Sequence, residues 1–209
     1  MNRLRVFVNN AENKGLAKRR RSLIEPEMES LMAKSPVVRG YLANQFGFSE
    51  TGREYLETRI KPGIAAIGIT MLDPFIECGK ELDWPYITKL ERDGRYSDLK
   101  DYWEAFNWKV TPLNNSLMRS SDCMLAILDG GADVDSGVAS EIGFYFGIRK
   151  GPIFALRSDF RLSENPAAPI NAQVMGYIAL SKGELVHGPG SLDRWFAKIR
   201  AWYDSLKIK

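Results

Sequence analysis

Short apolar runs alternate along this chain with longer segments whose apolar positions recur every three or four residues. The runs at 37–43, 69–72, 123–128, 152–156 and 174–180 have the length and composition of buried strands. Such alternation is typical of a parallel sheet whose successive strands are joined by helices. We therefore predict an α/β fold with a doubly wound, mainly parallel five-stranded sheet and helices on both faces, of the Rossmann or flavodoxin type.

Helix signals fill the segments between these runs. Ser49 is a suitable N-cap for a first helix, which Pro62 is expected to kink or end. A further helix is expected from about 112 to 121, directly before the third strand. Ser191 opens a final amphipathic helix.

Two segments do not follow the alternation. Residues 1–36 are basic and then acidic, and we expect an N-terminal extension that is solvated or loosely docked. Residues 77–108 form a polar insertion rich in aromatic residues, which is either a lid over the site or a packed excursion. The α/β domain itself is expected over 37–209.

Composition narrows the class of protein. With 209 residues and 44% hydrophobic content, the chain can form one sizeable core. A net charge of +3 is too small to indicate binding to nucleic acid, and no apolar run is long enough to span a bilayer. Two cysteines are too few for a disulfide framework, so the expected compartment is the reducing cytoplasm. His187 is the only histidine, which makes a zinc site improbable, and we expect no metal or cofactor.

The candidate chemistry lies in residues 125–143. An apolar run ends at Asp129, passes through a loop rich in Gly and Asp, and enters a helix for which Asp135 and Ser136 are suitable caps. Such junctions lie at the carboxyl ends of parallel strands, where these folds bind small ligands. Glu141 follows in the second turn of the helix, and its side chain leans back over Gly137, where there is room for a ligand.

Glu141 has two interpretations at this point. The exposed amides and positive end of the helix dipole would help to keep its carboxylate ionised, as a nucleophile requires. Alternatively, Glu141 only complements the dipole and Gly137 only tightens a turn.

Several segments together resemble a known family. They lie at 41–43, 72–75, 121–122, 135–137, 141–143, 157–161 and 169–171. The combination of Asp-Ser-Gly, a Glu-Ile-Gly beginning at Glu141 and a later Arg-Ser-Asp-Phe-Arg resembles the nucleoside 2-deoxyribosyltransferases, which form a superfamily with nucleotide N-glycoside hydrolases. The N-terminal extension and the long insertion are not covered by the resemblance.

The resemblance implies a double displacement at the anomeric carbon, with no cofactor. Glu141 would be the nucleophile, Tyr41 would orient it, and Asp135 would bind sugar or base as the third catalytic residue. The implied substrates are a nucleoside or nucleotide and a free nucleobase, with no nucleic-acid polymer and no membrane as partner. The candidate substrate-binding residues are Phe46, Phe48, Asp73, Phe75, Asn114, Asp129, Ser136, Gly137 and Asn171. Asn171 matches an amide donated across a subunit interface, which implies a homo-oligomer.

Asn114 departs from the family pattern, in which an Asp assists the leaving base. An amide can hydrogen-bond a base but cannot act as an acid. Either Asp73, Asp129 or Asp133 supplies the proton, or the leaving group is easier, or the activity has changed. Two further roles also stay open. Phe46 and Phe48 either stack on a base or pack in the core, and Arg157 and Arg161 either bind a phosphate or pair with Asp159 or Asp129 at the surface.

Three functions follow from these alternatives. The first is transfer of a deoxyribosyl group through a covalent intermediate on Glu141. The second is hydrolysis of a nucleoside 5′-monophosphate, in which water replaces the acceptor base. The third is a non-catalytic sensor or regulatory module that binds nucleotides.

Overall fold

The computed structural model describes residues 37–131, 133–162 and 167–208, so the expectations for residues 1–36 lie outside the described residues. A five-stranded, fully parallel sheet in the order β2-β1-β3-β4-β5 forms the centre of the 38–209 unit. The strands are β1 (Arg39–Ala43), β2 (Thr70–Leu72), β3 (Cys123–Ile127), β4 (Ile153–Arg157) and β5 (Glu184–His187). The predicted fold class is confirmed.

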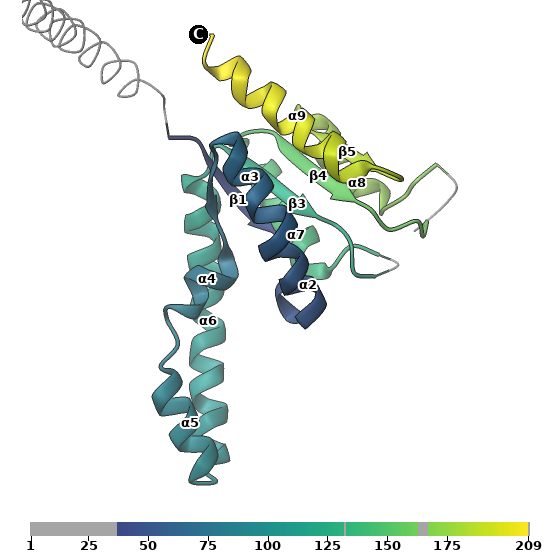
Figure 1. The fold of residues 1–209 in the computed structure, drawn as a ribbon. Helices are drawn as coiled ribbons and strands as arrows, with labels where there is room; N and C mark the ends of the chain where they lie inside the picture. Colours follow the sequence, from purple (N-terminus) through teal and green to yellow (C-terminus); the bar gives the residue numbers. More distant parts are fainter. Residues whose placement is uncertain (1–36, 132, 163–166, 209) are drawn as a thin grey trace, which may run out of the picture. The chain divides into compact units, whose positions relative to one another are not determined.

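Helices cover both faces of the sheet (Figure 1). One face packs against α2 (Glu50–Tyr55), η2 (Leu56–Ile60), α3 (Lys61–Ile67) and α9 (Ser191–Leu206). The other face packs against α6 (Tyr96–Ser120), α7 (Ser136–Gly147) and α8 (Ala172–Leu180). Because side chains alternate along a strand, Leu42 of β1 enters the first core and Tyr41 enters the second. Tyr41 therefore faces the helix that carries Glu141.

The first helical connection begins with the short 3₁₀ turn η1 (Phe46–Phe48) and then α2, whose predicted cap Ser49 accepts a hydrogen bond from the amide of Gly52 at 3.0 Å. The five-residue π-helical segment η2 joins α2 to α3. Pro62 lies in the first turn of α3, where a missing amide costs least. The proline therefore coincides with a change in helix type and does not end the helical path.

The fifth strand was predicted in the wrong place. Residues 174–180 belong to the helix α8, and the strand at that edge is β5, which ends at His187. A short apolar run fits a buried strand or a buried helix equally well. Here Asn171 caps a helix, and Val174 and Ile178 are buried one turn apart against the sheet. His187 is the exposed last residue of β5.

The insertion at 77–108 is helical. It consists of the end of α4 (Pro74–Gly79), then α5 (Trp84–Arg92) and the first half of α6, and Figure 1 shows α5 and α6 extending beyond the sheet as a hairpin. Ile87 and Leu90 are buried within the α5–α6 hairpin. The predicted helix at 112–121 thus begins already at Tyr96 and continues through Pro112. Whether the hairpin acts as a lid stays a prediction.

Candidate active site

The sheet has a switch point between β1 and β3. The connection from β1 to β2 and the connection from β3 to β4 leave these neighbouring strands toward opposite edges and opposite faces of the sheet. Folds of this strand order bind ligands in the crevice that such a divergence leaves at the carboxyl ends of the strands. Tyr41 lies in β1, and the loop from Leu128 to Asp135 follows β3.

The start of α7 fixes where Glu141 lies. The side chain of Asp135 caps the helix by accepting a hydrogen bond from the amide of Val138 at 3.0 Å. Gly137 follows in the first turn, where a side chain would meet only the Asp135 carboxylate within 4 Å. Glu141 lies one turn later and is partly buried. The cap at Asp135 agrees with the sequence prediction, whereas room for a ligand beside Gly137 stays a prediction.

Three elements converge on the Glu141 carboxylate. The Tyr41 hydroxyl of β1 donates a hydrogen bond to Oε1 at 2.6 Å, and Nδ2 of Asn114 in α6 donates to the same oxygen at 3.3 Å. Among the residues that the structure describes, Oε2 has no hydrogen-bond partner and Glu141 takes part in no ion pair. One oxygen of the carboxylate is therefore held by two donors, and the other is not engaged.

Burial controls the charge of Glu141. Burial is the main cause that raises the pKa of this carboxyl to about 7; the nearby Asp135 carboxylate acts in the same direction, whereas the hydrogen bonds from Tyr41 and Asn114 oppose the shift. Desolvation thus acts against the helix dipole, which was expected to help to keep Glu141 ionised. Burial and the neighbouring Glu141 also raise the pKa of Tyr41, so its hydroxyl stays protonated and acts as a donor.

Cys78 completes this cluster and was missed in the sequence analysis. Its thiol in α4 donates to Oδ1 of Asn114 at 3.6 Å, so both ends of the Asn114 amide are engaged. Burial raises the pKa of the Cys78 thiol, and the carboxylates of Glu141, Glu77, Glu81 and Asp73 act in the same direction. No sequence signal marks Cys78, because its partner lies 36 positions away on another helix.

Asp73 and Asp129 are both engaged in holding the structure. Asp73 caps α4 through the amide of Phe75 at 2.9 Å and forms an ion pair with Lys61 at 2.9 Å. The two carboxylate oxygens of Asp129 accept hydrogen bonds from the Ser158 hydroxyl and the Asp159 amide, each at 2.8 Å. The contacts of Asp129 tie the end of β3 to the end of β4, and those of Asp73 join the start of α4 to α3.

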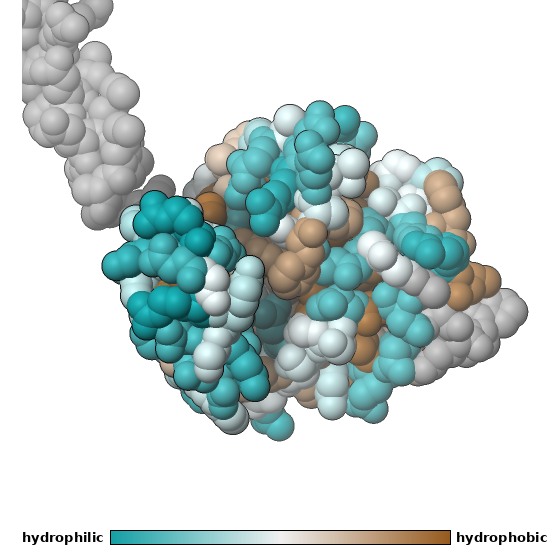
Figure 2. Space-filling view, turned by 90° about the horizontal axis from the view of Figure 1, so that it is seen from below, coloured by the Kyte–Doolittle hydropathy of each residue, from teal (hydrophilic) through white to brown (hydrophobic). Residues whose placement is uncertain are grey.

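The aromatic candidates lie around the loop after β1. A hollow of about 450 Å³ is lined by Gln45, Phe46, Phe48, Ser49, Thr51, Gly52, Tyr55 and Gly130. Phe48 is 79% exposed and packs edge-on against Phe75, with ring centroids 4.8 Å apart. In Figure 2 hydrophilic residues cover the α5–α6 hairpin, and apolar surface shows in the recess beside it.

The remaining candidates have structural contacts. Arg157 is fully buried and donates to the carbonyl oxygens of Leu128 at 2.7 Å and Gly131 at 3.3 Å, so the surface role considered for it is wrong. Arg161 instead pairs with Asp159 at the surface. The side chain of Asn171 caps α8. Ser136 is the exposed first residue of α7.

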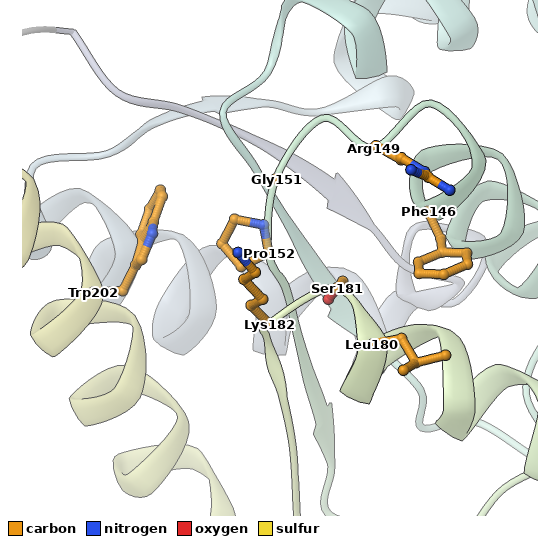
Figure 3. A pocket seen from close by; sticks show the side chains of 8 residues that line it. All are labelled: Phe146, Arg149, Gly151, Pro152, Leu180, Ser181, Lys182 and Trp202. Atoms are coloured by element: carbon orange, nitrogen blue, oxygen red, sulfur yellow. The ribbon is translucent and has the colours of Figure 1, made fainter.

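Another hollow in the described part of the chain lies away from Glu141. It measures about 710 Å³, and Figure 3 shows its lining by Phe146, Arg149, Gly151, Pro152, Leu180, Ser181, Lys182 and Trp202. Arg149 and Lys182 follow the carboxyl ends of α7 and α8, whose partial negative charge favours cations. These two basic residues thus complement helix ends and do not by themselves mark an anion site.

Comparison with models of protein families shows to which family this chain belongs. The family model described as nucleoside 2-deoxyribosyltransferase matches residues 40–173, which is more than half of the chain. The chain belongs to this family. The matched region contains the four residues of the hydrogen-bonded cluster, which are Tyr41, Cys78, Asn114 and Glu141.

Solved structures of 2-deoxyribosyltransferases are similar to this family member. The enzyme from Bacillus psychrosaccharolyticus is 16% identical, with a TM-score of 0.46 over 68% of this chain and 82% of that one. The enzyme from Leishmania mexicana is also 16% identical, with a TM-score of 0.42 over 66% of this chain and 85% of that one. A comparison with curated proteins finds no match. No helix in the described part of the chain is long and apolar enough to cross a membrane.

Proposed function

We propose that this protein cleaves the N-glycosidic bond of a (deoxy)nucleoside through a covalent intermediate on Glu141 and transfers the sugar to another nucleobase. One observation carries the proposal. Tyr41 and Asn114 hold Oε1 of Glu141, while Oε2 has no hydrogen-bond partner among the described residues. The family membership supports nucleoside and nucleobase as substrates.

The first step forms an ester. Oε2 of the Glu141 carboxylate attacks C1′ of the sugar, and the electron pair of the C1′–N bond leaves with the base. This is the logic of a retaining glycosidase, in which a carboxylate takes over a carbon with oxocarbenium character. The departing base takes its proton from solvent, because the Asn114 amide is not an acid.

The second step reverses the first. A ring nitrogen of another base attacks C1′ from the side the first base left, the ester bond breaks, and the electron pair returns to Glu141. The incoming base loses its proton to solvent, so the cycle ends with an ionised carboxylate. The Tyr41 hydroxyl and the Asn114 amide hold Oε1 throughout, which keeps Oε2 aligned with C1′.

The contacts of the two arginines do not favour a 5′-phosphate. Arg157 is directed at backbone carbonyls inside the protein, and Arg161 is paired with Asp159. Hydrolysis of a nucleoside 5′-monophosphate is therefore kept as an outcome of the experiment, as is binding without turnover.

The experiment incubates the protein with a deoxynucleoside and a second free base, with Glu141→Gln as the matched control. A new nucleoside is expected from the wild type and none from the variant. Free sugar alone, or sugar phosphate alone when the matching 5′-monophosphate is the substrate, would indicate hydrolysis, and tight binding without product would indicate a sensor. A deoxynucleoside with a 2-fluoro sugar should leave a sugar adduct on Glu141 that mass analysis of peptides detects. Full activity of Glu141→Gln would overturn the proposal.

A further inference from the structure

The Asn114 amide has two possible orientations, and only one of them suits Glu141. With Nδ2 toward Oε1 of Glu141, the amide donates a hydrogen bond to the carboxylate. With Oδ1 in that place, a carbonyl oxygen would face a carboxylate and raise the cost of ionising it. The ionised carboxylate itself favours the first orientation, and a donor to Oδ1 at the far end of the amide would add to this selection.

Cys78 supplies that donor. Its Sγ lies 3.6 Å from Oδ1 of Asn114, on the side of the amide opposite to Glu141. A protonated thiol donates only weakly, but it favours an oxygen over an NH₂ group at this point. The thiol keeps its proton because burial and four neighbouring carboxylates disfavour the thiolate.

We propose that Cys78 is a positioning residue that fixes the Asn114 amide with its NH₂ group toward Glu141 and so stabilises the ionised nucleophile. Only the predicted effect on kinetics rests on the proposed function. The effect of the thiol on the carboxylate, through the Asn114 amide, changes the protonation of Glu141 and is measurable without substrate. The groups facing Glu141 are Tyr41 from β1, Asn114 from α6, Asp135 from the start of α7, and Cys78 from α4.

Replacing Cys78 should therefore shift the pKa of Glu141. Cys78→Ala removes the donor to Oδ1, frees the amide to turn, and should raise the pKa of Glu141 by about half a unit, the effect of losing part of one hydrogen bond. Cys78→Ser keeps a donor of similar size and should restore the wild-type value. In an Asn114→Ala background, Cys78→Ala should cause no further shift, because the intermediate group is gone.

The test follows the ¹³C signal of the Glu141 carboxyl by NMR, assigned with Glu141→Gln, in the wild type, Cys78→Ala, Cys78→Ser and both Asn114→Ala backgrounds. Amide spectra establish that each variant is folded. An unchanged Glu141 titration in Cys78→Ala, or equal shifts in Cys78→Ala and Cys78→Ser, would overturn the proposal. The proposal would also be overturned if Cys78→Ala still shifted the pKa of Glu141 in the Asn114→Ala background, because Cys78 would then act on Glu141 through charge or desolvation.

Kinetics give the second measurement. In Cys78→Ala, kcat/KM should fall about threefold at pH 6 and stay near the wild-type value at pH 9, because only the ionised fraction of Glu141 changes. A purely structural loss would lower kcat/KM by the same factor at every pH. If the wild type transfers no sugar at all, the proposed function fails, while the NMR titrations still decide the role of Cys78.

Discussion

At the scale of single residues, Glu141 combines two properties that oppose each other. A nucleophile must be ionised, yet burial raises the pKa of this carboxyl to about 7. In the proposed mechanism, the raised pKa makes the ionised oxygen a more basic attacking group once it forms, and it ties the proposed activity to pH near neutrality.

We expect the activity to rise with pH through the pKa of Glu141. The ionised form is the reactive one, so kcat/KM should increase about tenfold per pH unit well below pH 7 and level off above it. Initial rates between pH 5 and pH 9 measure this directly. An acidic limb that stays flat down to pH 5 would show that Glu141 is not the titrating nucleophile.

The same shift predicts an effect of Glu141→Gln on stability. A folded-state pKa above the unfolded value means that the ionised carboxylate destabilises the fold at pH above 7, and that this cost disappears as the pH falls toward 4.5. Glu141→Gln should therefore raise the free energy of unfolding by about 1–3 kcal/mol at pH 8 and change it little at pH 5. Denaturant titrations at both pH values check the sign. Destabilisation at pH 8 would contradict it.

At the scale of elements, the sequence predicted those whose signals are local. The strand β1, the β3–α7 junction and the cap at Asp135 follow from a short pattern, and the structure has them. The apolar run at 174–180 was ambiguous, because helix and strand bury such a run equally well. The early start of α6 was missed because its amphipathic pattern is interrupted by polar and aromatic residues before Pro112.

The candidate site was likewise predictable only where its signals are local in the sequence. Glu141 follows from its place in the second turn after a capped loop, whereas Tyr41 was singled out only by resemblance to the family. The link from Cys78 to Asn114 depends on how α4 packs against α6, and nothing in the sequence encodes that contact locally. The structural use of Asp73 likewise depends on Lys61, which lies on a different helix.

The α5–α6 hairpin offers a test of its own stability. Leu90 is fully buried between its two helices, so Leu90→Ala should cost about 2–4 kcal/mol and increase amide exchange within the hairpin. Tyr96→Ala is the matched control, because Tyr96 is 70% exposed, and it should change little. Hydrogen exchange read by mass spectrometry separates hairpin peptides from those of β1 and β3. Equal loosening of the sheet strands would show that the hairpin does not open separately.

At the scale of the whole α/β unit, the two ends of the sheet differ in chemistry. The cluster around Glu141 lies at the β1–β3 switch point, while the larger hollow lies beside the carboxyl ends of α7 and α8. Arg157 links the end of β4 to the loop after β3 through the carbonyls of Leu128 and Gly131. The shape of the active-site edge thus depends on a cation buried inside the fold.

Arg157→Met should consequently affect both stability and substrate binding. The buried carbonyl of Leu128 and the part-buried carbonyls of Gly131 and Arg161 lose a charged donor, so we expect a loss of about 2–4 kcal/mol in the free energy of unfolding and a higher KM. Arg161→Met is the control, because among the described residues that exposed side chain pairs with Asp159 at the surface, and it should lower the free energy of unfolding much less. Thermal melts and steady-state kinetics compare the two. Equal effects would mean that the buried arginine is not an anchor.

Helix α6 gives the molecule a mechanical property. It is 25 residues long and runs unbroken from Tyr96, beside α5, to the sheet, with Asn114 near its anchored end. The 18 residues between Tyr96 and Asn114 correspond to roughly 27 Å of helix. A sideways force on the free end of a rigid helix that is fixed at its other end rotates the helix slightly about the fixed end. A load on the free end of this helix would therefore tilt the Asn114 amide that donates to Glu141, the proposed nucleophile.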